Sequence, residues 1–177
     1  RKMHTLALGP KALDLAAGQG RNAAFLAGQG FEVLALDVAD KAMESLKALD
    51  VPGISPVQAD LDTFPVRKES FDLIVCCYYL DRRLLPYIKE SLKSGGILLY
   101  ESAVESDQKA VSQLGNRDYL LRTNELLHSF LSMRIIAYHE GVFADDQHGQ
   151  RFRAVARLAA QKEWIGDASL VQNVDAS

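Results

Sequence analysis

The sequence has 177 residues, of which 48% are apolar and 24% are charged, and its formal net charge is −3. This length predicts one domain with a sizeable core, and the composition excludes collagen-like, disordered and coiled-coil chains. The slightly acidic balance provides no positive field for a phosphate backbone, so nucleic acid is disfavoured as a partner.

Strand and helix patterns alternate along the first hundred residues. Apolar runs predict the strands, and apolar residues at helical spacing predict the helices. The glycine pair Gly95-Gly96 is expected to end the third helix. The expected strands are 12–16, 31–36, 54–58, 71–77 and 97–100, and the expected helices are 21–27, 40–49 and 84–93.

The remaining chain carries different patterns. Residues 103–120 are polar and irregular, and Thr123 is expected to cap a helix over 124–131. Two late strands, 134–139 and 152–160, are joined by a polar turn at 144–149 that is too short for a crossover helix. These two strands should therefore be antiparallel. We expect the domain to occupy residues 1–162 and a weakly patterned tail to occupy 163–177.

This alternation predicts an α/β fold. We expect a doubly wound three-layer sandwich with a mostly parallel seven-stranded sheet and a C-terminal antiparallel hairpin. Ligands of such sheets bind beyond the carboxyl ends of the strands, where the strand order reverses. The rule selects four segments, which are 16–22, 37–38, 60–62 and 76–81.

A glycine-rich turn follows the first expected strand. Gly18, Gly20 and Ala23 form a GxGxxA pattern, which lets the backbone turn tightly and approach a ligand. Asp37 ends the next strand, where a carboxylate can accept hydrogen bonds from both hydroxyls of a ribose. An ordinary strand–helix turn is the alternative for the glycines alone, but the two features together indicate a nucleoside-bearing cofactor.

Five segments of the chain resemble class I S-adenosylmethionine-dependent methyltransferases, which have a Rossmann-like fold. The resemblance covers residues 11–162, and within the class GRN at 20–22 and GQR at 149–151 are most similar to the tellurite-resistance (TehB-like) group. The five segments are DLAAGQGRN at 14–22, LDV at 36–38, QADL at 58–61, FDLIV at 71–75 and KSGGILL at 93–99.

The resemblance implies S-adenosylmethionine as the cofactor and assigns residues to its parts. Asp37 would hold the ribose hydroxyls and Val38 would pack on the adenine. Asp60 and the Leu61 amide would bind the adenine edge, while Cys76 and Cys77 would pass close to the sulfonium through their carbonyls. Many relatives have Gly-Cys where this chain has Ala16-Ala17. The residues implied around the methionine part are Asp14, Ala16, Ala17, Gly18, Gly20 and Asn22.

The acceptor side is less well defined by the sequence. Tyr78 and Tyr79 follow the fourth strand and either line the acceptor pocket or belong to the core. In the TehB-like group the segment holding His148 and Arg151 folds over the site, and a solvated turn is the alternative. The chain lacks the Asn/Asp-Pro-Pro-Tyr/Phe pattern of amino methyltransferases after this strand, which favours a small-molecule substrate. The resemblance to the TehB-like group implies that this substrate is an oxyanion or a chalcogen nucleophile.

Two other functions are compatible with parts of the sequence. An NAD-dependent oxidoreductase would also use the GxGxxA turn and Asp37, but no Tyr-x-x-x-Lys pair is present. A non-catalytic nucleotide-binding module would keep the cofactor residues without turnover. The histidines have no metal-ligand spacing, the apolar runs are shorter than the ~20 residues of a membrane helix, and the two cysteines are adjacent. We therefore expect a cytoplasmic enzyme without a metal site or a membrane segment.

Overall fold

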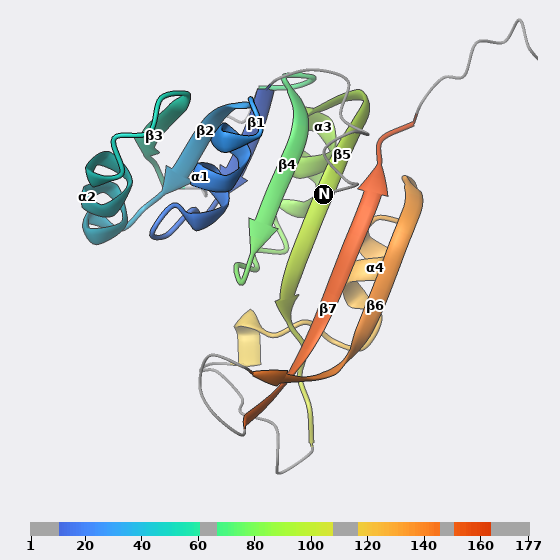
Figure 1. The fold of residues 1–177 in the computed structure, drawn as a ribbon. Helices are drawn as coiled ribbons and strands as arrows, with labels where there is room; N and C mark the ends of the chain where they lie inside the picture. The colour runs from blue at the N-terminus through green and yellow to red at the C-terminus, as the bar shows by residue number, and fades with distance from the viewer. Residues whose placement is uncertain (1–10, 61–66, 108–116, 146–150, 164–177) are drawn as a thin grey trace, which may run out of the picture.

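A seven-stranded sheet of strand order β3-β2-β1-β4-β5-β7-β6 forms the centre of the protein (Figure 1). The structure is a computed structural model that describes residues 11–60, 67–107, 117–145 and 151–163. In chain order the strands are β1 (Lys11–Leu15), β2 (Glu32–Asp37), β3 (Ile54–Gln58), β4 (Phe71–Cys77), β5 (Leu92–Ala103), β6 (Arg134–Asp145) and β7 (Arg151–Gln161). The helices are α1 (Arg21–Gly28), α2 (Asp40–Ala48), α3 (Leu85–Ser91) and α4 (Glu125–Ser129), with a short 3-10 helix, η2, at Arg117–Tyr119.

The strand order reverses between β1 and β4. β1 pairs in parallel with β2 on one side and with β4 on the other, and the chain completes β2 and β3 before it returns as β4. The loops after β1 and β4 therefore leave the sheet in opposite directions, and a crevice forms between their carboxyl ends. This arrangement confirms the mostly parallel sheet that the sequence predicts.

The C-terminal hairpin is antiparallel, as expected, but longer than expected. β7 pairs antiparallel with both β5 and β6, and β6 extends through residue 145 into the segment predicted to be a turn. The hairpin places β7 inside the sheet and β6 at its edge.

Two predicted boundaries around α3 and β5 are wrong. The helix ends at Ser91, and β5 begins at Leu92 and includes Gly95-Gly96. The pairing of β4 with β5 shifts register here, from Phe71 opposite Leu92 to Leu73 opposite Ile97, so the glycines lie in a bulge of the strand rather than in a helix cap. A Cβ atom at Gly96 would lie 3.0 Å from the carbonyl oxygen of Lys93.

The predicted cap of α4 is also wrong. The N-cap residue is Asn124, with φ of 60°, and no side chain caps the helix. The amide of Asn124 instead donates to the carboxylate of Glu140 on β6, at 2.9 Å. A contact with a distant strand thus replaces the local cap that Thr123 was expected to supply.

Two hydrophobic clusters cover the two sides of the sheet. In β1, Ala12 belongs to one cluster and Leu13 to the other, as the alternation of a strand requires. Leu26 of α1 and Leu46 of α2 pack in the first cluster, whereas residues of α3 and α4 pack in the second. Figure 1 shows α3 and α4 behind the sheet, while no described helix lies in front of β7 and β6.

None of the helices in the described part of the chain is both long enough and apolar enough to cross a membrane.

Candidate functional site

The loop from β1 to α1 is a tight turn whose backbone is held from several sides. Ala16, Gly18 and Gly20 all have positive φ, of 54°, 54° and 79°. The Ala17 amide donates to the carbonyl of Leu36 at the end of β2, and the Gly20 amide donates to the carbonyl of Ala17, both at 2.9 Å. Nothing lies within 4 Å of the position that a Cβ atom of Gly18 would occupy, so its backbone faces open space.

Asp37 fixes the turns that follow two neighbouring strands. One carboxylate oxygen accepts from the Gly18 amide at 2.8 Å, and the other accepts from the Ala39 amide at 2.9 Å. Each carboxylate oxygen can accept a second hydrogen bond. The side chain therefore orders the glycine turn and keeps acceptor capacity for a ligand's hydroxyl groups.

Asp14 is a buried carboxylic acid at the base of the same turn. Its side chain is 1% exposed, and neither carboxylate oxygen forms a hydrogen bond with a described residue. Burial raises its pKa to about 7, and the charge of Asp37 adds to this shift. The Ala23 amide and the Asn22 side chain lower the pKa in part, although neither meets the geometry of a hydrogen bond. An uncompensated buried carboxylate is costly, and a positively charged partner would remove the cost.

The end of β3 lies beside the turn after β2. The Ala59 amide donates to the Asp37 carbonyl at 3.0 Å, which places Asp60 next to this turn. The side-chain amide of Gln58 donates to the Val38 carbonyl at 3.1 Å and to the Asp40 carboxylate at 2.7 Å. Val38 itself is 62% exposed, so its apolar side chain is available for packing against a planar group.

Tyr78 and Tyr79 follow β4 but line different cavities. Tyr78 has a positive φ of 56°, and its amide donates to the carbonyl of Glu101 at 2.8 Å. Its side chain lines a cavity of about 220 Å³, whereas Tyr79 lines a cavity of about 470 Å³ together with Asp60. The carbonyl of Tyr79 accepts from the Tyr100 hydroxyl at 2.7 Å. The two tyrosines that the sequence groups together thus lie in different surroundings.

The two cysteines at the end of β4 are protonated thiols. Burial raises the pKa of Cys76 to about 12 and, with repulsion from Glu101, raises that of Cys77 to about 11. Cys76 is fully buried in one cluster, whereas Cys77 packs against the other and lines a cavity of about 640 Å³ beside Asn22. Neither thiol is suited to act as a nucleophile at neutral pH.

A group of arginines lies beside Tyr78, and the sequence analysis missed it. The 220 Å³ cavity is lined by Arg21 of α1, Glu101 of β5, Phe143 of β6, and Arg153 and Arg157 of β7. The signal was present in β7, where Arg153 and Arg157 lie four residues apart and so on one face of the strand, but the cavity depends on pairing registers that the sequence does not reveal.

Three predicted site residues lie outside what the structure describes. Leu61 and His148 belong to segments that are not described, and of Arg151 only the backbone position in β7 is given. Among the described residues, no group of three histidine, cysteine or acidic side chains could hold a metal ion.

A protein-family model matches the part of the chain that contains the candidate site. The family described as "Methyltransferase domain" matches residues 12–96. This range contains β1 to β4 and the turns that hold Asp14, Gly18 and Asp37. None of the curated proteins matches this chain in sequence.

Solved structures share the fold. TehB from Haemophilus influenzae is similar over 88% of this chain, with 25% identity and a TM-score of 0.74. This chain spans only 59% of that protein's length. An S-adenosylmethionine-dependent methyltransferase from Mesorhizobium loti is similar over 88% of this chain and 92% of its own, with 18% identity and a TM-score of 0.70.

A third similar structure is that of the [4+2]-cyclase SpnF, with 16% identity and a TM-score of 0.69 over 90% of this chain and 76% of its own. Taken together, the family match and the similar structures support a class I S-adenosylmethionine-dependent methyltransferase domain. The match to a methyltransferase domain supports S-adenosylmethionine as the cofactor. Because a cyclase shares the fold, the reaction has to be argued from the site.

Proposed function

We propose that this protein transfers the methyl group of S-adenosylmethionine to a small-molecule acceptor and that it is a member of the TehB-like group. The observation that carries the proposal is the pairing of Asp37 with the Gly18 turn above the uncompensated carboxylate of Asp14. This arrangement offers hydroxyl acceptors, open backbone and a negative charge within one turn.

The residues of the turn suit the parts of the cofactor. The methionine part carries an ammonium group and a sulfonium, and either positive charge would satisfy the buried carboxylate of Asp14. The backbone of Ala16, Ala17, Gly18 and Gly20 would wrap this part, with Asn22 beside it. Gly18 leaves room for close approach because its Cβ position is open.

The nucleoside part would extend toward β2 and β3. Asp37 would accept the ribose hydroxyls with its remaining lone pairs, and the exposed side chain of Val38 would pack on the adenine. Asp60 and Leu61 would bind the adenine edge. Gln58 supports this arrangement because it holds the Val38 carbonyl in place.

The chemistry requires little from the protein beyond orientation. When the cofactor is bound, a lone pair of the acceptor forms a bond to the methyl carbon, the carbon–sulfur bond breaks, and its electron pair remains on the neutral sulfur. Alignment of the two reactants can supply about 7–11 kcal/mol in favourable cases. A base is needed only for a protonated acceptor, whose proton would pass to solvent or to a side chain.

The acceptor would bind next to the end of β4, where the backbone carbonyls of Cys76 and Cys77 would lie close to the sulfonium. Tyr78 supports this placement because it lies between the end of β4 and the arginine-lined cavity. His148 and Arg151 stay predictions for the acceptor side. By resemblance to the TehB-like group, the acceptor would be an oxyanion or a chalcogen nucleophile.

Parallel calorimetric titrations with S-adenosylmethionine, S-adenosylhomocysteine and NAD test the cofactor part of the proposal. We expect micromolar binding of the first two ligands and no heat signal with NAD. Transfer is then tested by following S-adenosylhomocysteine formation by mass spectrometry with a panel of small acceptors. Binding of NAD alone, or cofactor binding without turnover on any acceptor class in a full-length protein, would overturn the proposal.

A further inference from the structure

The cavity beside Tyr78 has an excess of positive charge. Its charged lining residues are three arginines, Arg21, Arg153 and Arg157, and a single carboxylate, Glu101. Because the cavity volume is about 220 Å³, it can hold a small group rather than an extended chain. A small anion would reduce the repulsion among the three guanidinium groups.

Two of the arginines are held in place by neighbours. The Nε atom of Arg157 donates to the carboxylate of Glu101 at 2.6 Å, and its guanidinium lies 4.3 Å from the ring centre of Phe143. The guanidinium of Arg153 lies 5.8 Å from the ring centre of Tyr78. Aromatic contacts of this kind orient a guanidinium group, which carries five N–H donors in a planar fork.

The third arginine approaches from the other side of the cavity. Arg21 is the first residue of α1, directly after the glycine turn, and it is exposed. Within the described part of the chain it forms no hydrogen bond or ion pair. Among the residues that the structure describes, its charge is therefore unpaired and available to a bound group.

The cavity lies where an acceptor would be needed. It contacts the turn after β1 through Arg21 and the end of β4 through Tyr78, which are the two elements that flank the point of strand reversal. We propose that Arg21 and Arg153 bind an anionic group of the methyl acceptor in this cavity, with Arg157 held by Glu101 as its wall. This inference rests on the proposed function, because it assigns the acceptor's charge to a site next to the cofactor.

The test uses the full chain saturated with S-adenosylhomocysteine, whose binding is first measured by calorimetry. Benzoate, the neutral isostere benzamide, and selenite are then titrated while the Nε–H signals of the arginine side chains are followed by NMR. We expect at least one of the two anions to bind at least tenfold more tightly than benzamide and to shift these signals. Whether benzoate or selenite is favoured distinguishes an organic carboxylate from an inorganic oxyanion.

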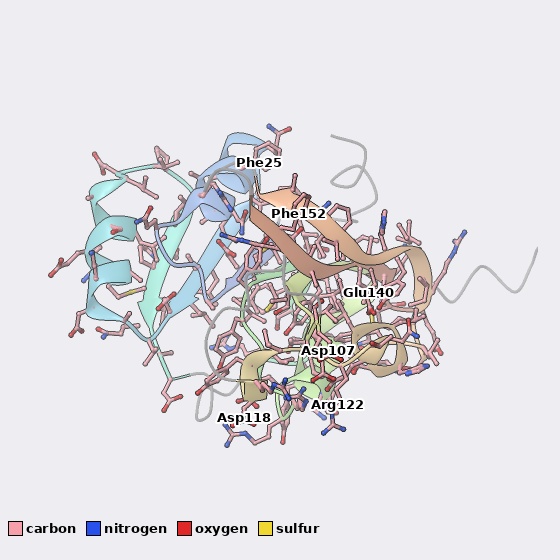
Figure 2. The ribbon with its side chains drawn as sticks, turned by 90° about the horizontal axis from the view of Figure 1, so that it is seen from below. Phe25, Asp107, Asp118, Arg122, Glu140 and Phe152 are labelled. Atoms are coloured by element: carbon pink, nitrogen blue, oxygen red, sulfur yellow. The ribbon has the colours of Figure 1, made fainter. Side chains whose placement is uncertain are left out.

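Three variants test which residues bind the anion. R153Q and R21Q should each weaken anion binding at least tenfold. R21Q should do so without disturbing the fold, because Arg21 forms no hydrogen bond or ion pair among the described residues. R122Q is the matched control, because Arg122 is exposed and lies on the other side of the molecule from Phe25 of α1 (Figure 2). It should leave anion binding unchanged.

The outcomes separate this inference from the proposed function. Equal binding of benzoate, selenite and benzamide, or anion binding that R21Q and R153Q leave unchanged, would overturn the inference while cofactor binding stands. Anion binding at these arginines in a protein that does not bind S-adenosylhomocysteine would instead overturn the proposed function and the acceptor role of the cavity.

Discussion

The carboxylate of Asp37 accepts a hydrogen bond of 2.8 Å from the amide of Gly18, and this contact ties the end of β2 to the turn after β1. Sequence reasoning gives Asp37 a role in ligand binding only. In the structure the same side chain also holds the turn that the ligand would contact. Changes at Asp37 are therefore expected to affect folding as well as binding.

The D37A variant should weaken S-adenosylhomocysteine binding by about 1–3 kcal/mol because hydrogen bonds to a charged acceptor are lost. It should also lower the free energy of unfolding, since the Gly18 and Ala39 amides lose their acceptor. Calorimetry and urea unfolding measure the two effects. D50N is the control, because Asp50 is an exposed carboxylate after α2, and it should change neither quantity. Unchanged affinity in D37A would mean that the ribose binds elsewhere.

The pKa of Asp14, raised by burial from 3.8 to about 7, makes stability depend on pH. The folded protein holds this proton more tightly than the unfolded chain does. The contribution of Asp14 to the free energy of unfolding is therefore complete below about pH 4 and is lost as the pH rises through about 7. The D14N variant has no such loss. We expect the unfolding free energy of the wild type minus that of D14N to fall over this range, as measured by urea unfolding, and a flat difference would contradict the raised pKa.

Cofactor binding should release the proton of Asp14. If the positive charge of S-adenosylmethionine lies beside this carboxylate, it lowers the pKa of Asp14 below about 7, so affinity rises with pH toward that value. Calorimetric titrations at pH 6.5 in two buffers with different ionisation enthalpies would reveal the released proton as a difference in heat. D14N should give the same heat in both buffers. Equal heats for the wild type would place the positive charge away from Asp14.

Gly18 and Gly30 form a matched pair for testing the cofactor loop. Both have positive φ, of 54° and 90°, and neither has an atom within 4 Å of its Cβ position. G18A and G30A should each lower the free energy of unfolding by about 1–2 kcal/mol, because a side chain disfavours this backbone conformation. Only G18A should also weaken cofactor binding, because its new methyl group faces the proposed site. Equal affinities of the two variants in calorimetry would argue against backbone contact at Gly18.

Ala16 stores backbone strain that glycine would relieve. Its φ is 54°, whereas the φ of the neighbouring Ala17 is not positive. A16G should leave the free energy of unfolding unchanged or raise it by up to about 1 kcal/mol, and A17G should lower it by about 1 kcal/mol. Urea unfolding of the two variants tests the comparison. A loss of stability in A16G equal to that in A17G would show that the strain at Ala16 is negligible.

The parts of the fold that local patterns determine were predictable. The strands at Ile54–Gln58 and Phe71–Cys77 have the predicted bounds, and the alternation of strands and helices gives the parallel sheet. Gly95-Gly96 was misinterpreted because a strand bulge and a helix end use the same residue type. The cap of α4 depends on Glu140, and no local rule finds a partner sixteen residues away.

Part of the candidate site could likewise be predicted from local motifs, and part could not. Asp14, Gly18 and Asp37 lie in short motifs, so the sequence placed them together, and the structure brings them to one turn. Arg153 and Arg157 share one face of β7, but their meeting with Glu101 of β5 and Phe143 of β6 depends on the register of β7 with both neighbours, and Arg21 joins them from α1. Two arginines four residues apart in a strand indicate that they share one face, but this spacing does not say which cavity the face lines.

The position of β7 has a consequence for biosynthesis. Of the strands that the structure describes, β7 is made last, yet it lies between β5 and β6, so neither neighbour can complete its hydrogen bonds until residue 161 has been synthesised. A nascent chain would expose the unpaired edge of β5 during this interval, and such edges recruit other chains. Ribosome stalling before β7 should therefore favour aggregation far more than stalling after it.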